Sequence, residues 1–145
     1  MRNWIFQANP KKYEIFKSLS TEAMERWNAR QYVRKISIGD RVYVWICGPQ
    51  AGIYGVGTVL TLPSVMLDTP AGIRYWTDPA EGRRPIARVD VRYDRIMLDR
   101  PLLKPYLLAD PVLQNLSILR MWRGTNFPVE PDEARALEEW LADTT

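Results

Sequence analysis

Two of the six tryptophans in this sequence have polar and charged neighbours, and they are the residues best placed to act at a surface. Trp27 is followed by Asn28 and Arg30, and Trp76 comes two residues after Arg74. Flat aromatic faces stack on nucleic-acid bases, and two faces opposite each other form a slot for one extruded base. Burial in a hydrophobic core would explain both tryptophans equally well. The remaining tryptophans have strongly apolar or helix-packing surroundings and are expected in the core: Trp4, Trp45, Trp122 and Trp140.

Amide and cationic side chains could add recognition to these aromatic surfaces. Asn9 and Asn28 are candidate readers of a base edge, because an amide offers both a donor and an acceptor. Turn formation is the competing explanation, above all for Asn9 before Pro10. Five cations could contact phosphates, and an ordinary solvated surface explains them equally well: Arg30, Arg34, Lys35, Arg83 and Arg84.

Catalytic chemistry has little support in the composition. The chain has no His, which excludes His-based triads, His general bases and most zinc sites. The single Cys, Cys47, lies in an apolar segment and is expected to be an inert core residue. The nearest carboxylate cluster (Asp90, Asp94 and Asp99) is interrupted by basic residues and lacks a following Asp-x-Lys or Glu-x-Lys pair. We therefore predict a non-enzymatic protein with no catalytic residue, metal or cofactor.

Charge is distributed unevenly along the 145 residues, whose net charge is +3. Residues 1–128 contain 19 Lys and Arg against 11 Asp and Glu, whereas residues 129–145 contain one Arg against six acids. A basic body favours polyanionic partners, and an acidic last helix does not. The length suits a single domain over residues 1–145. No segment has the pattern of a signal peptide or a membrane helix, so we expect a cytoplasmic protein without membrane contact.

Hydrophobic patterning predicts the elements that would position these residues. At the start of the chain we expect a short strand over 2–7 and a helix over 11–19. A second short helix, capped by Ser20 or Thr21, is expected to follow. This arrangement would put Trp27 at the end of a helix.

Two apolar strands are expected in the middle of the sequence, over 41–47 and 53–60. The first is apolar on both faces beyond its first residue, which favours a central place in the sheet. Gly55 and Gly57 lie two residues apart in the second strand and therefore share one face. Paired glycines of this kind indicate the close approach of another group or a bend in a barrel.

The second half begins with a long irregular stretch over 63–84, with Trp76 inside it. A connection of this length in a compact domain is usually functional or disordered. A long strand over 84–97 and short helical turns over 102–119 are expected next. A final helix begins at Pro131, with a buried stripe formed by Ala134, Leu137 and Leu141. The whole pattern predicts an α+β fold with a curved sheet or small barrel.

Five segments, in order along nearly the whole chain, carry a family resemblance. They are WIFQANP at 4–10, WNAR at 27–30, IGDRVYVW at 38–45, AGIYGVG at 51–57 and GTNFP at 124–128. Together they resemble the EVE domain, a member of the PUA-like superfamily that also contains the YTH RNA readers. The glycine-rich strand and the terminal GTNFP segment are fairly specific as a pair.

The resemblance implies a PUA-like fold, a small curved β-barrel of five to six strands flanked by short helices. It also implies a pocket for a modified base. Trp27 matches the first aromatic residue of the family's cage, and Trp76 is the best match for the second. The other residues predicted to line the pocket are Asn9, Asn28, Tyr13 and Tyr54.

The function implied by the resemblance is the reading of modified bases by extrusion into that pocket. Modified cytosine in DNA, such as 5-methylcytosine or 5-hydroxymethylcytosine, is the expected target, with N6-methyladenine as the other candidate and DNA favoured over RNA. Family members are often fused to restriction nucleases or McrB-like GTPases. The implied partners are therefore modified DNA and a nuclease or GTPase, encoded separately or fused in a longer protein, within a restriction or defence system.

Two other functions remain open from the sequence. The acidic helix over 130–142, or the region around Trp122, could dock a partner protein and leave the pocket vestigial. The third possibility is an enzyme that acts on nucleic acid.

Overall fold

The computed structural model describes residues 1–143, in which a mixed β-sheet is flanked by short helices. The sheet runs in the order β2-β6-β4-β3-β1-β8, with β5 paired to β6 and β7 paired to β4. The strands are β1 (Asn3–Ala8), β2 (Met24–Asn28), β3 (Arg41–Ile46), β4 (Gly52–Val59), β5 (Ser64–Met66), β6 (Ile86–Ile96), β7 (Leu102–Leu103) and β8 (Asn126–Val129). The helices are α1 (Ile15–Thr21), α2 (Pro70–Tyr75), α3 (Pro79–Gly82), α4 (Lys104–Ala109), the short 3-10 turn η1 (Leu113–Asn115), α5 (Ser117–Arg120) and α6 (Pro131–Asp143).

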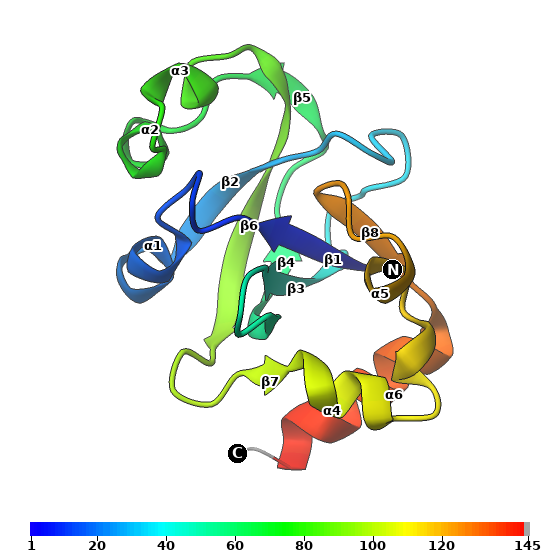
Figure 1. Cartoon of the computed structure of the whole chain (residues 1–145). Helices are drawn as coiled ribbons and strands as arrows, with labels where there is room; N and C mark the ends of the chain where they lie inside the picture. The colour runs from blue at the N-terminus through cyan, green and yellow to red at the C-terminus, as the bar shows by residue number, and fades with distance from the viewer. Residues whose placement is uncertain (144–145) are drawn as a thin grey trace.

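Alternating side chains along β3 divide the interior into two hydrophobic clusters. Val42 and Val44 join the cluster that includes residues of β2 and β6, whereas Tyr43 and Trp45 join the cluster covered by the C-terminal helices. Figure 1 shows α1, α2 and α3 at one end of the sheet and α4 and α6 at the other. The predicted central place of this strand is confirmed, because β3 lies between β1 and β4 and is buried on both faces.

The predicted α+β class and curved sheet are confirmed. β1 and β3 pair in parallel, and the other pairs are antiparallel. Register shifts between Val44 and Trp45, and between Val56 and Gly57, mark β-bulges on the two sides of β4. Bulges increase the local twist and bend of a strand, so they help the sheet to curl.

The prediction of a second short helix ending at Trp27 is wrong, because residues 24–28 form strand β2. Glu25 and Trp27 are buried and their neighbours are less so, which is the period-two pattern of a strand. The predicted capping residues, Ser20 and Thr21, are instead the last two residues of α1. Their hydroxyls donate to the Lys17 carbonyl.

The stretch over 63–84, expected to be irregular, is folded into β5, α2 and α3. Each of these two helices has Pro in its first turn after a side-chain cap, with Thr69 accepting from the Gly72 amide and Asp78 accepting from the Ala80 amide. Trp76 therefore follows the end of a capped helix rather than lying in an open loop.

Trp122 also departs from its prediction, since 67% of its surface is exposed. The core prediction is confirmed for Trp4 and Trp45, which are buried, and Trp140 packs partly buried against the second cluster.

Helix α6 confirms the predicted start at Pro131 and the buried stripe of Ala134, Leu137 and Leu141. Its Glu138 accepts from Arg41 Nε at 2.6 Å and from the Tyr43 hydroxyl at 2.6 Å. The acidic helix is thus fixed against β3. Within residues 1–143, no helix has the length and apolar character needed to cross a membrane.

Gly55 and Gly57, two of the three glycines of β4, differ in how closely β6 approaches them. A Cβ on Gly57 would lie 2.6 Å from the Arg92 carbonyl oxygen and 2.7 Å from Val91 Cγ1. A Cβ on Gly55 would lie 3.3 Å from its nearest neighbour, the Arg95 carbonyl oxygen. The predicted close approach is confirmed, and it is tightest at Gly57.

We expect Gly57→Ala to lower the free energy of unfolding by about 2 kcal/mol, because the new methyl group meets a backbone atom that cannot move aside cheaply. The matched variant Gly55→Ala should cost about 1 kcal/mol or less, since its contact is looser. Urea unfolding followed by tryptophan fluorescence measures both values. Equal losses in the two variants would contradict this account of the β4–β6 contact.

Candidate functional site

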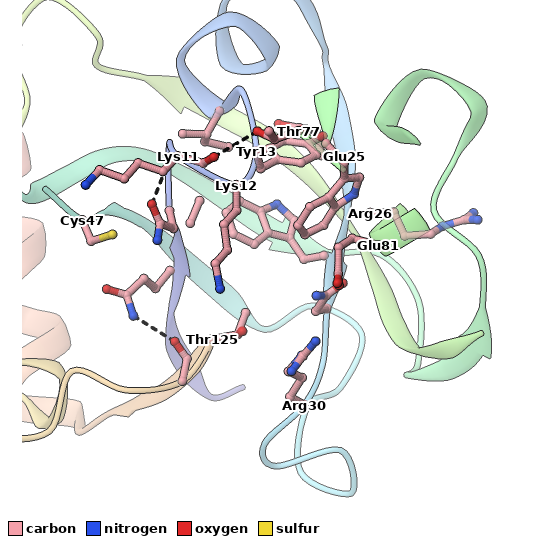
Figure 2. A pocket seen from close by; sticks show the side chains of 18 of the residues that line it. Lys11, Lys12, Tyr13, Glu25, Arg26, Arg30, Cys47, Thr77, Glu81 and Thr125 are labelled. Atoms are coloured by element: carbon pink, nitrogen blue, oxygen red, sulfur yellow. Dashed lines mark hydrogen bonds between the residues drawn. The ribbon is translucent and has the colours of Figure 1, made fainter. Parts of the chain in front are cut away.

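A cavity of about 890 Å³ opens between β1, β2, α3 and the loop before β8. Four stretches of the chain line it, within residues 7–15, 25–31, 76–84 and 122–125, together with Cys47. Figure 2 shows this cavity and the side chains around it. Segments far apart in sequence therefore meet at one concave surface.

Trp27, from β2, is held at the cavity through its ring nitrogen. Its Nε1 donates to the Tyr93 hydroxyl at 3.1 Å, and that hydroxyl donates to Glu25 Oε1 at 2.6 Å. The Trp27 ring packs against Phe6, with ring centroids 5.9 Å apart. Only 7% of Trp27 is exposed, so most of the residue is packed in the core and a small part of it reaches the cavity.

Trp76 is held in a similar way by a second carboxylate. Its Nε1 donates to Asp68 Oδ2 at 2.7 Å, and the Tyr13 ring meets it in an edge-on contact with centroids 4.9 Å apart. A Cβ on Gly82 would lie 2.8 Å from Trp76 Cδ1, so α3 packs directly against the indole. Because both indole N–H groups donate to residues outside the cavity lining, each tryptophan can offer the cavity only aromatic carbon surface.

Two buried carboxyl groups support these aromatic residues. Glu25 accepts hydrogen bonds from the hydroxyls of Tyr13, Ser18 and Tyr93. Burial raises the pKa of Glu25 above its usual range, although the three hydroxyl donors oppose the shift. Burial likewise raises the pKa of Asp68, against the opposing hydrogen bond from Trp76. Burial and the nearby Glu25 raise the pKa values of Tyr13 and Tyr93, so both hydroxyls stay protonated and remain donors.

Four amide side chains line the cavity, and their partners fix which end of each amide is used. Asn28 Oδ1 accepts from the buried Arg88 at 2.6 Å, and Arg can only donate. Asn9 Oδ1 accepts from the Lys11 amide at 3.0 Å. Gln31 Oε1 accepts from the Thr125 and Asn126 amides. In Asn9, Asn28 and Gln31 the side-chain nitrogen has no hydrogen-bond partner among the described residues.

Gln7 has the opposite orientation. Its Nε2 donates to the carbonyls of Trp122 and Gly124, both at 2.8 Å, which leaves Oε1 unbonded. Every buried side-chain nitrogen or oxygen in residues 1–143 has a hydrogen-bond partner, so the four unbonded amide ends are not buried. Among the described residues, the four lining amides thus leave three nitrogen donors and one oxygen acceptor without a partner.

Positive charge exceeds negative charge around the cavity. The lining cations are Lys11, Lys12, Arg26, Arg30, Arg84 and Arg123, against three acids, Glu25, Asp78 and Glu81. Arg26 pairs with Asp90 at 2.7 Å and Arg84 with Glu81 at 3.1 Å. The other four cations form no salt bridge with the described residues. Figure 2 shows Lys12 and Arg30 directed toward the cavity and Arg26 directed away from it.

The structure brings together five of the six residues predicted to line the pocket: Trp27, Trp76, Asn9, Asn28 and Tyr13. Tyr54 lies outside the cavity lining, because its ring packs against Phe16 at 5.4 Å and its hydroxyl donates to the Gln50 carbonyl. The hydrogen bond of Asn9 also confirms its turn-forming role.

Of the five predicted phosphate-binding cations, Arg30 and Arg84 line the cavity. The other three lie outside its lining: Arg34, Lys35 and Arg83. Lys35 instead lies over the Tyr32 ring, 6.0 Å from its centroid.

Sequence reasoning missed several lining residues, above all Gln7, Gln31, Lys11 and Lys12. A usable signal was their place within or next to the segments 4–10 and 27–30, because Gln7 lies in the first segment and Lys11, Lys12 and Gln31 directly follow one of the two. Cys47 was expected in the core but is half-buried in the cavity wall. Burial raises the pKa of the Cys47 thiol, which keeps it protonated and weakly nucleophilic. Residues 1–143 contain no group of three His, Cys, Asp or Glu side chains placed to hold a metal ion.

Solved structures share this fold across nearly their whole length. A hypothetical protein from Leishmania major superposes with a TM-score of 0.73 and 20% identity, over 99% of this chain and 96% of that one. A Pseudomonas putida protein gives a TM-score of 0.67 and 22% identity, over 94% and 97%. Human THYN1, solved in complex with 5-methylcytosine containing DNA, gives 0.68 and 15%, over 94% and 95%. At these identities the likeness establishes the fold, and it confirms the predicted PUA-like architecture.

Sequence comparison identifies the family. No curated protein matches the chain. The model of the EVE domain, however, matches residues 2–140, nearly the entire sequence. The protein therefore belongs to the EVE domain family.

Proposed function

We infer that this protein is a non-enzymatic reader of a modified base in nucleic acid, and that the base is extruded into the cavity between Trp27 and Trp76. The observation that carries this inference is the presence of two tryptophans in the lining of one cavity, with both indole N–H groups bonded to residues outside that lining. Such surfaces bind a planar ring by stacking, which contributes about 1–3 kcal/mol per base. They offer no group for proton transfer or bond cleavage.

The polarity of the amides favours cytosine among the candidate bases. The pairing edge of cytosine has two acceptors, O2 and N3, and one donor, the N4 amino group. Three amide donors and one acceptor around the cavity suit that pattern better than the edge of adenine, which has one acceptor and one donor. The complex of human THYN1 with 5-methylcytosine containing DNA also supports modified cytosine, and DNA over RNA. Our proposal is therefore 5-methylcytosine or 5-hydroxymethylcytosine in DNA.

Affinity for the DNA backbone would come from the four cavity cations that form no salt bridge within residues 1–143: Lys11, Lys12, Arg30 and Arg123. Contacts of this kind hold phosphates and weaken with salt, and they carry no sequence information by themselves. In a restriction or defence system, a reader of this type would direct a separate nuclease or GTPase to modified DNA.

The alternative of partner docking through the C-terminal helix gains no support from the packing. The apolar stripe of α6 is already buried against the sheet, and Glu138 is engaged by Arg41 and Tyr43. Docking through the apolar stripe would require the helix to leave the second hydrophobic cluster, so only its exposed acidic face is open to a partner.

We expect the protein to bind a duplex with one 5-methylcytosine or 5-hydroxymethylcytosine about tenfold more tightly than the unmodified duplex, because a fitted methyl group is worth about 1–3 kcal/mol. Trp27→Ala and Trp76→Ala should each lower affinity for the modified duplex by about tenfold or more, since each removes one stacking surface. Fluorescence anisotropy with labelled duplexes, including one with N6-methyladenine, measures these affinities.

Trp140→Phe is the control, because this tryptophan lies outside the cavity and the smaller ring preserves most of its packing. It should bind as the native protein does. The proposal would be contradicted if all duplexes bound with equal affinity and if Trp27→Ala and Trp76→Ala left that affinity unchanged.

Asn28→Asp tests the reading of a base edge. The carboxylate keeps a partner in Arg88, but the inward N–H donor is replaced by an acceptor. We expect a loss of about tenfold or more in affinity for the modified duplex, because the buried base acceptor loses its donor. Asn115→Asp on η1 makes the same charge change at an exposed site outside the cavity and should have little effect. Binding of Asn28→Asp at native strength would remove Asn28 from the recognition scheme.

A further inference from the structure

The short loop after α5, residues 121–124, places two apolar side chains in solvent beside the cavity. Met121 is 68% exposed and Trp122 is 67% exposed. Trp122 also contributes to the cavity lining, on the wall formed by residues 122–125. It is thus the most exposed of the six tryptophans, and nothing in the fold of residues 1–143 requires it to be apolar.

The backbone under these exposed side chains is held in place. Gln7 Nε2 donates to the Trp122 and Gly124 carbonyls, both at 2.8 Å. Gln31 Oε1 accepts from the Thr125 amide at 3.0 Å. Gly124, the last residue of the loop, has a φ of +124°, a conformation that favours glycine. A large ring on an anchored loop loses little conformational freedom when it binds.

The charges around the loop indicate the kind of ligand that its exposed side chains would bind. Arg120 precedes Met121 and Arg123 follows Trp122, and neither Arg forms a salt bridge in the described part of the chain. Arg123 and Arg30 both line the adjoining cavity. Exposed apolar groups framed by cations suit a ligand that is anionic outside and flat and apolar inside, which describes a nucleic-acid duplex.

We propose that Met121 and Trp122 form a wedge that enters the DNA duplex at the gap left by the extruded base. The proposal rests on the proposed function, and adds a surface for the duplex to the pocket for the base. Extruding a base costs its stacking and pairing, and an apolar side chain between base steps offsets part of that cost. A single strand has no such gap, so the wedge stabilises the complex with a duplex only.

The test compares one modified strand as a single strand and as a duplex. We expect Trp122→Ala to lower affinity for the modified duplex by about tenfold, the scale of one lost stacking contact, and affinity for the single strand by less than about twofold. Trp122→Phe should retain most of the duplex affinity. A fluorescent base analogue next to the modified base should report unstacking with the native protein and less of it with Trp122→Ala.

Tyr106→Ala is the matched control, because Tyr106 is an exposed aromatic residue on α4 outside the cavity lining. It should change neither affinity. Equal losses on both substrates for Trp122→Ala would overturn the wedge, and so would no loss on either. Failure of the proposed function has a different signature, in which the native protein shows no preference for the modified strand even when it is single.

Discussion

Burial of two carboxyl groups, Glu25 and Asp68, is the constraint on which the site depends. A buried carboxylate is costly unless donors surround it, so each must be met by hydrogen bonds from other segments. For Glu25 those donors come from Tyr13 before α1, Ser18 in α1 and Tyr93 in β6. Asp68 accepts a hydrogen bond from Trp76, the residue that follows α2. Satisfying the two acids therefore brings α1, α2, β2 and β6 to one place, and it fixes both tryptophans as it does so.

The strongly patterned elements of this fold could be predicted from sequence. The apolar run of β3, the paired glycines of β4 and Pro131 at the start of α6 each determine their structure through local chemistry. β2 could not be predicted in the same way. From the local sequence, Glu25 would be assigned to the solvent-facing side of a helix. Its burial depends on a hydrogen bond from Tyr93, which lies 68 residues later in the chain. Long-range partners of this kind decide whether a polar residue faces the core.

The candidate site was predictable in its aromatic residues and less so in its polar ones. Trp27 and Trp76 stand out by their polar neighbours, and the family resemblance paired them. No local sequence pattern distinguishes Gln7 and Gln31, because their hydrogen bonds are to the distant 122–126 segment, which they hold beside the cavity. Trp122 was expected in the core from the apolar residues before it, Leu119 and Met121, although Arg123 follows it directly. In the structure, its loop is tied down through backbone carbonyls, which leaves the ring free of the core.

The hydrogen bond from Arg88 to Asn28 has a consequence for how specificity could change in this family. Arg88 is fully buried and also donates to the Met66, Glu81 and Arg84 carbonyls, so its guanidinium is locked in place. The direction in which Asn28 presents its amide is therefore set by a residue that does not line the cavity. An acceptor at position 88 would turn the amide around and present its oxygen instead. Selection for a different base edge could thus act on residue 88 and leave every residue at the cavity unchanged.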